Sequence, residues 1–313
     1  MKITKIPKHH PIFTTILFFV IAQILTFAIA SQESSYLETN NIYMPTQPDQ
    51  TISVWPGPVT SPSGEITQTP AYSSLGPIVI YFLTVTAGVA IVLAKIPLSA
   101  LKVALRILFA FLLAWGAFIA FVFLIPFAGA IGIAAAMGIV WFLVPRIWFH
   151  NLAMILALAS VGAVFGRFIT PWTIMAVMGA LGVYDLLAVR FGFMLWLTSK
   201  LSVVGVLPAL VIPKNPSHWR ADLRQETIAN LINQEPAERE YSLVGGGDIA
   251  FPCLLAASVF FARGLGTASI IGAFTLLGLM LAYLIQAVFL KGKPVPALPP
   301  IAALALVGLL VIR

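Results

Sequence analysis

Most of this chain is divided into apolar runs long enough to cross a lipid bilayer, and a backbone in lipid must satisfy its polar groups internally. Only 9% of the residues are charged, whereas a soluble domain carries about 25%. The predicted fold class is therefore all-α, a polytopic membrane protein with about nine transmembrane helices. The predicted spans are 12–30, 77–95, 104–125, 127–144, 149–166, 171–190, 243–262, 268–290 and 296–312.

The positions of the basic residues predict how the chain is oriented. If successive connections alternate between the two sides of the membrane, all 18 lysines and arginines except Arg167, Arg263 and Arg313 lie on the side of the N-terminus. This positive-inside bias predicts that the N-terminus is inside and the C-terminus outside. The net charge of +7 is then explained by topology, and no nucleic-acid partner is expected. We expect an integral, multi-pass protein of the cell membrane.

The connections divide the chain into three parts. Residues 1–190 form an N-terminal part with six helices, and its loop 31–76 is polar, lacks Lys and Arg, and fits the outer side. Residues 191–242 form an inner connecting loop. Its stretch 220–240 is either a short surface helix or a disordered linker. Residues 243–313 form a C-terminal part with three helices. Tryptophans near the predicted span ends fit interfacial belts: Trp141, Trp148, Trp172 and Trp196.

The first predicted span has an alternative interpretation. Lysines at positions 2, 5 and 8, an apolar run and the small residues of 28–31 resemble a cleavable signal peptide, although the run is longer than usual. The lone cysteine, Cys253, allows no intramolecular disulfide and no thiolate metal cluster. The four histidines never form a His-Glu-x-x-His motif, so neither a metal nor a cofactor is expected.

Two acids, Asp185 and Asp248, lie within the predicted spans. A carboxylate in the bilayer core costs about 2.5–3.5 kcal/mol, so such an acid suggests a functional site. Asp185 lies five residues before the predicted end of the sixth span, and Asp248 lies five residues after the predicted start of the seventh. At 1.5 Å per residue, each acid is on the order of 7–8 Å from the inner boundary. The matching depths predict that the two carboxyls meet.

Two carboxyls in contact share a proton more readily than they both ionise. The ionised one can then remove a proton from water, while the other hydrogen-bonds a carbonyl under attack. Gly245, Gly246 and Gly247 precede Asp248 and permit close approach of a substrate strand, and Pro252 weakens the helix after it.

Other interpretations remain open for these acids. Either one alone could be a structural acid bonded to a neighbouring hydroxyl or paired with Arg190. Together they could form the relay of a proton-coupled transporter or channel. Against a transporter, both acids lie in the second half of the chain, without the counterpart that inverted repeats would supply. A prepilin-type peptidase also carries a Gly-x-Gly-Asp motif but would fit the order of spans poorly.

Three motifs in order resemble the presenilin and signal peptide peptidase family of intramembrane aspartyl proteases. They are Tyr184-Asp185 in the sixth span, Gly245-x-Gly247-Asp248 at the seventh, and Pro296-Ala297-Leu298 before the ninth. The resemblance implies that Asp185 and Asp248 are the catalytic pair. It also implies that Pro296, Ala297 and Leu298 shape the active site and, with Tyr184, Gly245 and Gly247, position the substrate.

The resemblance further implies that the chain cleaves transmembrane-helix protein substrates within the lipid bilayer. The inside N-terminus matches the presenilin branch. Because the loop 191–242 is brief and holds no long hydrophobic insert, we expect a compact microbial homologue that acts without obligate partner subunits.

Overall fold

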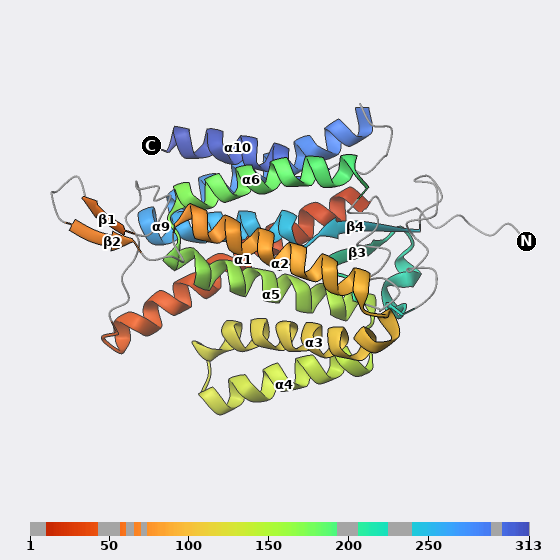
Figure 1. The fold of residues 1–313 in the computed structure, drawn as a ribbon. Helices are drawn as coiled ribbons and strands as arrows, with labels where there is room; N and C mark the ends of the chain where they lie inside the picture. The colour runs from red at the N-terminus through yellow and green to blue at the C-terminus, as the bar shows by residue number, and fades with distance from the viewer. Residues whose placement is uncertain are drawn as a thin grey trace, which may run out of the picture.

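The computed structural model describes residues 11–42, 57–60, 66–69, 74–192, 206–224, 240–288 and 296–312. This part of the chain is dominated by long helices that lie roughly side by side (Figure 1). Six of them are long and apolar enough to cross a membrane, which confirms a polytopic membrane protein. The helices are α1 (Pro11–Thr39), α2 (Leu75–Lys95), α3 (Leu98–Val122), α4 (Phe127–Leu143), α5 (Ile147–Phe168), α6 (Pro171–Arg190), α9 (Gly247–Val288) and α10 (Leu298–Val311).

Helix α9 is two helical segments joined by a sharp turn. Gly264 sits at the turn with φ 84° and ψ 173°, a conformation that glycine adopts without steric cost. The first segment packs in parallel on α5, because Gly162 faces Cys253 and Gly166 faces Ala257. A Cβ at Gly166 would lie 2.5 Å from the Cβ of Ala257, so these helices approach as closely as small residues allow.

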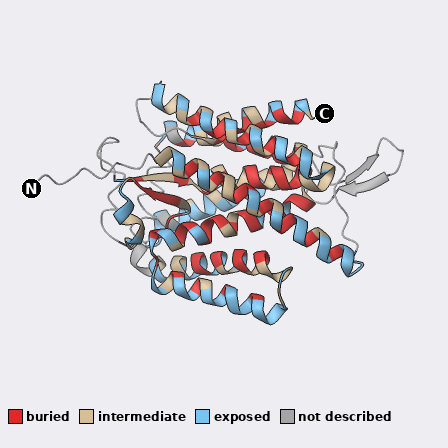
Figure 2. Cartoon of the chain, turned by 180° about the vertical axis from the view of Figure 1, so that it is seen from behind, coloured by how far each residue is buried: buried red, intermediate tan, exposed pale blue. Residues whose placement is uncertain are grey.

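The bundle is arranged around α1, α5 and α9, which all contact one another. Helices α6 and α10 lie on one side, where both contact α9, and the pair α3 and α4 lies on the other side against α5 (Figure 1). Helix α2 lies at the periphery, and α6 is its principal neighbour among the described elements. The exposed positions gather on the outward faces of the bundle, as Figure 2 shows, and these faces carry many large apolar side chains. Such faces suit lipid rather than water.

Helix α1 extends beyond the predicted first span, which ended at residue 30. It continues to Thr39 because its acid Glu33 is paired inside the bundle. The Nε of Arg167 donates to Oε1 of Glu33 at 2.7 Å, and the guanidinium also lies 4.3 Å from the ring centre of Phe261. A buried charge is tolerated when it is paired in this way.

Two short antiparallel ribbons interrupt the helical pattern at opposite ends of the bundle (Figure 1). Strands β1 (Gly57–Thr60) and β2 (Ile66–Thr69) lie in the polar loop, and β3 (Ala209–Pro213) pairs with β4 (Tyr241–Gly245). A 3₁₀ helix, η2 (Pro216–Arg220), follows β3. The ribbons were not expected from the sequence. The stretch 220–240, expected to be a short helix or a linker, falls mostly outside the described residues.

The predicted start of the seventh span at residue 243 is wrong. Residues 241–245 form β4, and the helix begins only at Gly247. Leu243, Val244 and Gly245 of β4 are apolar enough to extend the hydropathy of the following span, but their backbone groups pair with β3. Asp248 therefore lies in the first turn of α9 instead of five residues inside it.

Strand β3 is anchored to α5 by buried polar side chains. Nδ2 of Asn151 donates to the Val211 carbonyl at 2.7 Å, and the Val211 amide donates to Oδ1 of Asn151 at 2.9 Å. Trp141 Nε1 donates to His150 Nδ1, and His150 Nε2 then donates to the Ala209 carbonyl. The expectation that Trp141 lies in an interfacial belt is thus wrong, because its indole is fully buried.

Candidate active site

Asp185 lies near the end of α6, where the helix faces both α9 and α10. Its side chain is half-buried. One turn earlier, Gly182 meets the start of α10, because a Cβ at this position would lie 3.4 Å from the Cα of Pro299. The close approach at Gly182 sets α6 against α10 directly beside Asp185.

Asp248 lies at the junction of β4 and α9. The Gly246 amide donates to the Pro208 carbonyl at 3.0 Å, and the Ala250 amide donates back to the Gly246 carbonyl at 2.9 Å. The chain therefore changes from strand to helix within one turn. The backbone amide of Gly245 hydrogen-bonds the Asp248 carboxyl. This turn holds the carboxyl at the edge of the β3–β4 ribbon.

The carboxyls of Asp185 and Asp248 lie close enough to interact electrostatically. They are brought together by the contact between α6 and the first segment of α9. Pro252 removes the amide that would bond the Asp248 carbonyl in a regular helix, so the backbone at Asp248 has an acceptor free of helical pairing.

The three residues Pro296, Ala297 and Leu298 form the beginning of α10. Ala297 is the N-cap and Leu298, which is buried, is the first helical residue. Because Pro299 follows directly and packs on Gly182, this segment lies one turn of α6 away from Asp185. Residues 289–295, which precede it, are outside the described part of the chain.

Tyr184 lies beside Asp185 on α6 and interacts with its carboxyl electrostatically. Its ring makes an edge-on contact with Phe82 of α2, with the ring centres 6.3 Å apart. The tyrosine thus links the candidate site to the peripheral helix α2.

Tyr283 and Thr15 are neighbours of the site that the sequence analysis did not identify. The second segment of α9 returns past Asp248, and Tyr283 lies within electrostatic range of that carboxyl. The Tyr283 side chain also hydrogen-bonds Thr15 of α1, whose hydroxyl donates to the Pro11 carbonyl at 3.0 Å. No local pattern in the sequence marks these two residues, because Tyr283 and Thr15 lie far apart in the chain.

The functional groups at the site are carboxyls and backbone amides and carbonyls. Among the described residues, no group of three or more His, Cys, Asp or Glu side chains could hold a metal ion. Two interacting carboxyls, beside backbone that is partly unpaired and inside a membrane-spanning bundle, define a class of protein with paired-acid chemistry in the membrane.

Comparison with known proteins identifies that class more closely. The family model described as "Signal-peptide peptidase, presenilin aspartyl protease" matches residues 62–313. A presenilin-family intramembrane aspartate protease, solved in the C222 space group, has a similar fold with a TM-score of 0.53. It is 19% identical to this chain, and the alignment covers 96% of each chain. No curated protein sequence matches the chain.

The chain belongs to the signal peptide peptidase and presenilin family, since the match spans most of its length. It is therefore an intramembrane aspartyl protease, a hydrolase, as the motifs suggested. Neither the family nor the fold supports the alternative of a proton-coupled transporter.

Proposed function

We propose that Asp185 and Asp248 are the catalytic pair that hydrolyses peptide bonds within transmembrane helices of substrate proteins. The observation that carries this proposal is that these two carboxyls, which come from different helices, lie close enough to interact electrostatically. Structural acids would have their own neutralising partners, as Glu33 has in Arg167.

In the proposed reaction, the two carboxyls hold one proton between them before the substrate arrives. The ionised carboxyl removes a proton from a water molecule, whose oxygen attacks the peptide carbonyl. The protonated carboxyl donates its proton to the carbonyl oxygen, which yields a tetrahedral diol. Proton transfer from the first carboxyl to the amide nitrogen then breaks the C–N bond, and the second carboxyl recovers its proton from a hydroxyl of the diol.

Gly245, Gly247 and the segment Pro296, Ala297 and Leu298 are proposed to position the substrate, together with Tyr184. A substrate helix must unwind locally before its peptide bond can reach the carboxyls, and its freed backbone groups then need partners. The turn before Asp248 and the start of α10 supply backbone groups on either side of the pair. A side chain at Gly245 would crowd the carboxyl, because its Cβ would lie 3.1 Å from Asp248 Oδ2.

The proposed setting is the cell membrane, with nine spans, the N-terminus inside and the C-terminus outside. The turn at Gly264 supports two separate spans within α9, and the shorter helices α4 and α10 bring the number to nine. We propose that the chain acts without obligate partner subunits, because the loop 191–242 is brief and holds no long hydrophobic insert.

The test is cleavage of a single-span substrate peptide by the purified protein in liposomes, with products identified by mass spectrometry. Asp185→Asn and Asp248→Asn should each lower the rate by at least about 10²–10⁴-fold, the usual contribution of a positioned acid or base. Asp222→Asn is the matched control, since Asp222 lies outside the spans and pairs with Arg224. Thermal unfolding should show that all three variants remain folded.

Inhibitors that mimic the diol should block cleavage, and chelators should leave it unchanged. Cleavage that persists in either active-site variant would remove that aspartate from the mechanism. Inhibition by a zinc chelator that added metal reverses would contradict the two-carboxyl chemistry.

A further inference from the structure

His150 lies in the first turn of α5 and connects helices α3 and α4 to strand β3. Its ring is fully buried and stacks on Phe109 of α3, with the ring centres 5.8 Å apart and the planes 17° apart. The indole of Trp141 on α4 is also fully buried, and its centre lies 4.9 Å from that of the Phe109 ring. Aromatic packing on two sides therefore fixes the plane of the imidazole.

The two hydrogen bonds of the His150 ring determine which of its nitrogens carries the proton. The indole Nε1 of Trp141 can only donate, so His150 Nδ1, at 3.1 Å from it, accepts and carries no proton. The Ala209 carbonyl oxygen can only accept, so His150 Nε2, at 2.9 Å from it, carries the proton. The ring is therefore neutral, with its one proton directed at β3.

Ala209 lies opposite Gly245 in the β3–β4 ribbon. Opposite residues of an antiparallel ribbon alternate between pairs that bond each other and pairs whose N–H and C=O groups point outward. The preceding residue of β3 bonds across the ribbon, because the Pro208 carbonyl accepts from the Gly246 amide at 3.0 Å. The backbone groups of Ala209 and Gly245 therefore point outward, to the two edges of the ribbon.

The two outward partners of this pair are His150 and Asp248. On the edge of β3, the Ala209 carbonyl accepts from His150, and on the edge of β4 the Gly245 amide bonds the Asp248 carboxyl. Because the two backbone residues do not bond each other, contacts at the edges fix how the pair is oriented. The His150 side chain is thus placed to control the amide that holds Asp248.

We propose that His150, in this neutral form, is a positioning residue for the cleavage reaction. By bonding the Ala209 carbonyl it fixes the Ala209–Gly245 pair, and through the Gly245 amide it fixes the orientation of the Asp248 carboxyl. The inference rests on the proposed catalytic role of Asp248. It gives a role in cleavage to α3 and α4, which lie on the opposite side of the bundle from α6 and α10 (Figure 1).

The first experiment measures cleavage of a single-span peptide in liposomes by two variants of His150. His150→Phe keeps a ring against Phe109 but removes the donor to Ala209. We expect it to lower kcat at least about tenfold with little change in KM, because a small displacement of a catalytic group is costly in rate. His150→Gln supplies a side-chain N–H of similar reach, so its kcat should be within about threefold of that of the unaltered protein.

A purely structural role would change the folded fraction and leave the two variants with equal kcat per folded molecule. Thermal unfolding of the same preparations gives the folded fraction. Equal kcat values in His150→Phe and His150→Gln would therefore overturn the proposal. If His150→Phe keeps the full kcat while Asp248→Asn loses it, the proposal is also overturned, and the assignment of Asp248 stands.

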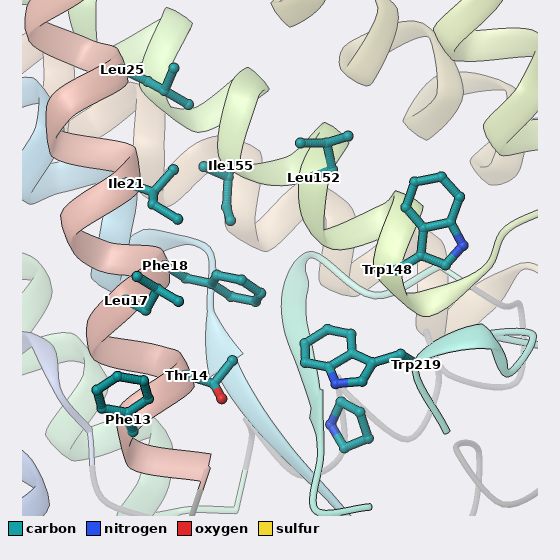
Figure 3. A pocket seen from close by; sticks show the side chains of 11 residues that line it. Phe13, Thr14, Leu17, Phe18, Ile21, Leu25, Trp148, Leu152, Ile155 and Trp219 are labelled. Carbon is teal, nitrogen blue, oxygen red and sulfur yellow. The ribbon is translucent and has the colours of Figure 1, made fainter. Parts of the chain in front are cut away.

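Two aromatic residues near His150 provide matched controls. Trp148 lies on the same turn of α5 but lines an apolar groove together with Leu152 and Trp219 (Figure 3), and it is 47% exposed. His218 of η2 stacks on Tyr241, at the end of β4 away from Asp248, with the ring centres 5.7 Å apart. Trp148→Phe and His218→Phe should each leave kcat within about twofold, as partly exposed substitutions usually do.

The coupling between His150 and Gly245 tests the route by which the histidine acts. His150→Phe and Gly245→Ala disturb the same backbone pair, so the loss of kcat in the double variant should be smaller than the product of the single losses. His218→Phe combined with Gly245→Ala should give the simple product. A simple product for the His150 combination would show that His150 does not act through Gly245.

Nitrogen-15 NMR of the full chain, labelled in its histidine rings and held in lipid nanodiscs, identifies the protonated nitrogen directly. The signals of His150 are those lost in His150→Gln. We expect a protonated Nε2 and an unprotonated Nδ1, and Trp141→Phe should shift the Nδ1 signal while leaving the Nε2 signal in place. A proton on Nδ1 in the unaltered protein would overturn the proposal. Because this measurement needs no cleavage, it separates a failure of this inference from a failure of the aspartate assignment.

Discussion

The carboxyl of Asp248 is held in a turn that leaves little space for additional atoms. A Cβ at Gly245 would lie 3.1 Å from Asp248 Oδ2, and a Cβ at Gly246 would lie 3.0 Å from the Pro208 carbonyl. The glycines are therefore needed for different reasons: the first leaves room for the carboxyl, and the second lets the strand pack on its neighbour. Such contacts are tighter than ordinary van der Waals packing and require some movement.

Gly245→Ala should lower the cleavage rate about tenfold or more while changing the unfolding temperature little. The added methyl meets the end of a side chain, which can rotate away, so the carboxyl loses its position before the fold loses stability. The control is Gly88→Ala on α2, where a Cβ would meet nothing within 4 Å. Kinetics and thermal unfolding on the same preparations separate the two effects, and an unfolding defect equal to the catalytic one would contradict the argument.

Tyr283→Phe and Thr15→Val should each lower kcat about threefold to tenfold with little change in KM. The hydrogen bond between these side chains contributes about 0.5–1.5 kcal/mol and fixes Tyr283 near Asp248. The double variant should be no worse than either single one, since both remove the same interaction. Tyr81→Phe is the control, because Tyr81 is 72% exposed on α2. Additive losses would mean that the two residues act independently.

At the scale of elements, the site depends on a short strand that a helix holds in place. Asn151 on α5 pairs with both backbone groups of Val211, as a neighbouring strand would. Strand β3 then pairs with β4, which leads directly to Asp248. The position of the carboxyl is thus set by a series of hydrogen bonds that runs from Asn151 on α5 through β3 to β4.

Asn151→Ala should destabilise the protein by about 2–4 kcal/mol, because it leaves a buried amide and a buried carbonyl without partners. Asn215→Ala is the control, since its side chain accepts one exposed hydrogen bond from Ser217, worth about 1 kcal/mol or less. Unfolding in detergent measures both. A loss no larger than that of Asn215→Ala would show that β3 does not depend on this anchor.

At the scale of the whole molecule, the chain must place its charged ends on defined sides of the membrane. Helix α1 runs parallel to α5, because Glu33 meets Arg167 and Thr26 meets the Ala159 carbonyl. The Glu33–Arg167 pair lies at the end of the bundle opposite to β3 and β4, so one of the three basic residues predicted outside is neutralised within the protein.

Single cysteines should reveal this orientation. After Cys253→Ser, Glu38→Cys should react with a membrane-impermeant thiol reagent in intact cells, and Lys95→Cys should react only after permeabilisation. Glu38 and Lys95 lie in the last turns of α1 and α2, at opposite ends of the bundle (Figure 1), and the lysine distribution places Lys95 inside. The reverse pattern would invert the topology and place the candidate site near the outer surface.

The amino-acid sequence alone determined the membrane-spanning character of this protein and its candidate acids. Long apolar runs satisfy their backbone hydrogen bonds in lipid by forming helices, and a carboxyl within such a run stands out from its apolar neighbours. Residues with local signals, such as Asp185, Asp248 and the glycines, were therefore found. Only the tertiary structure could assign β4, where Leu243, Val244 and Gly245 look like the start of a span until their pairing with β3 is seen. The same holds for Tyr283, Thr15 and Asn151. Their roles depend on partners far away in the chain, and no local pattern carries that information.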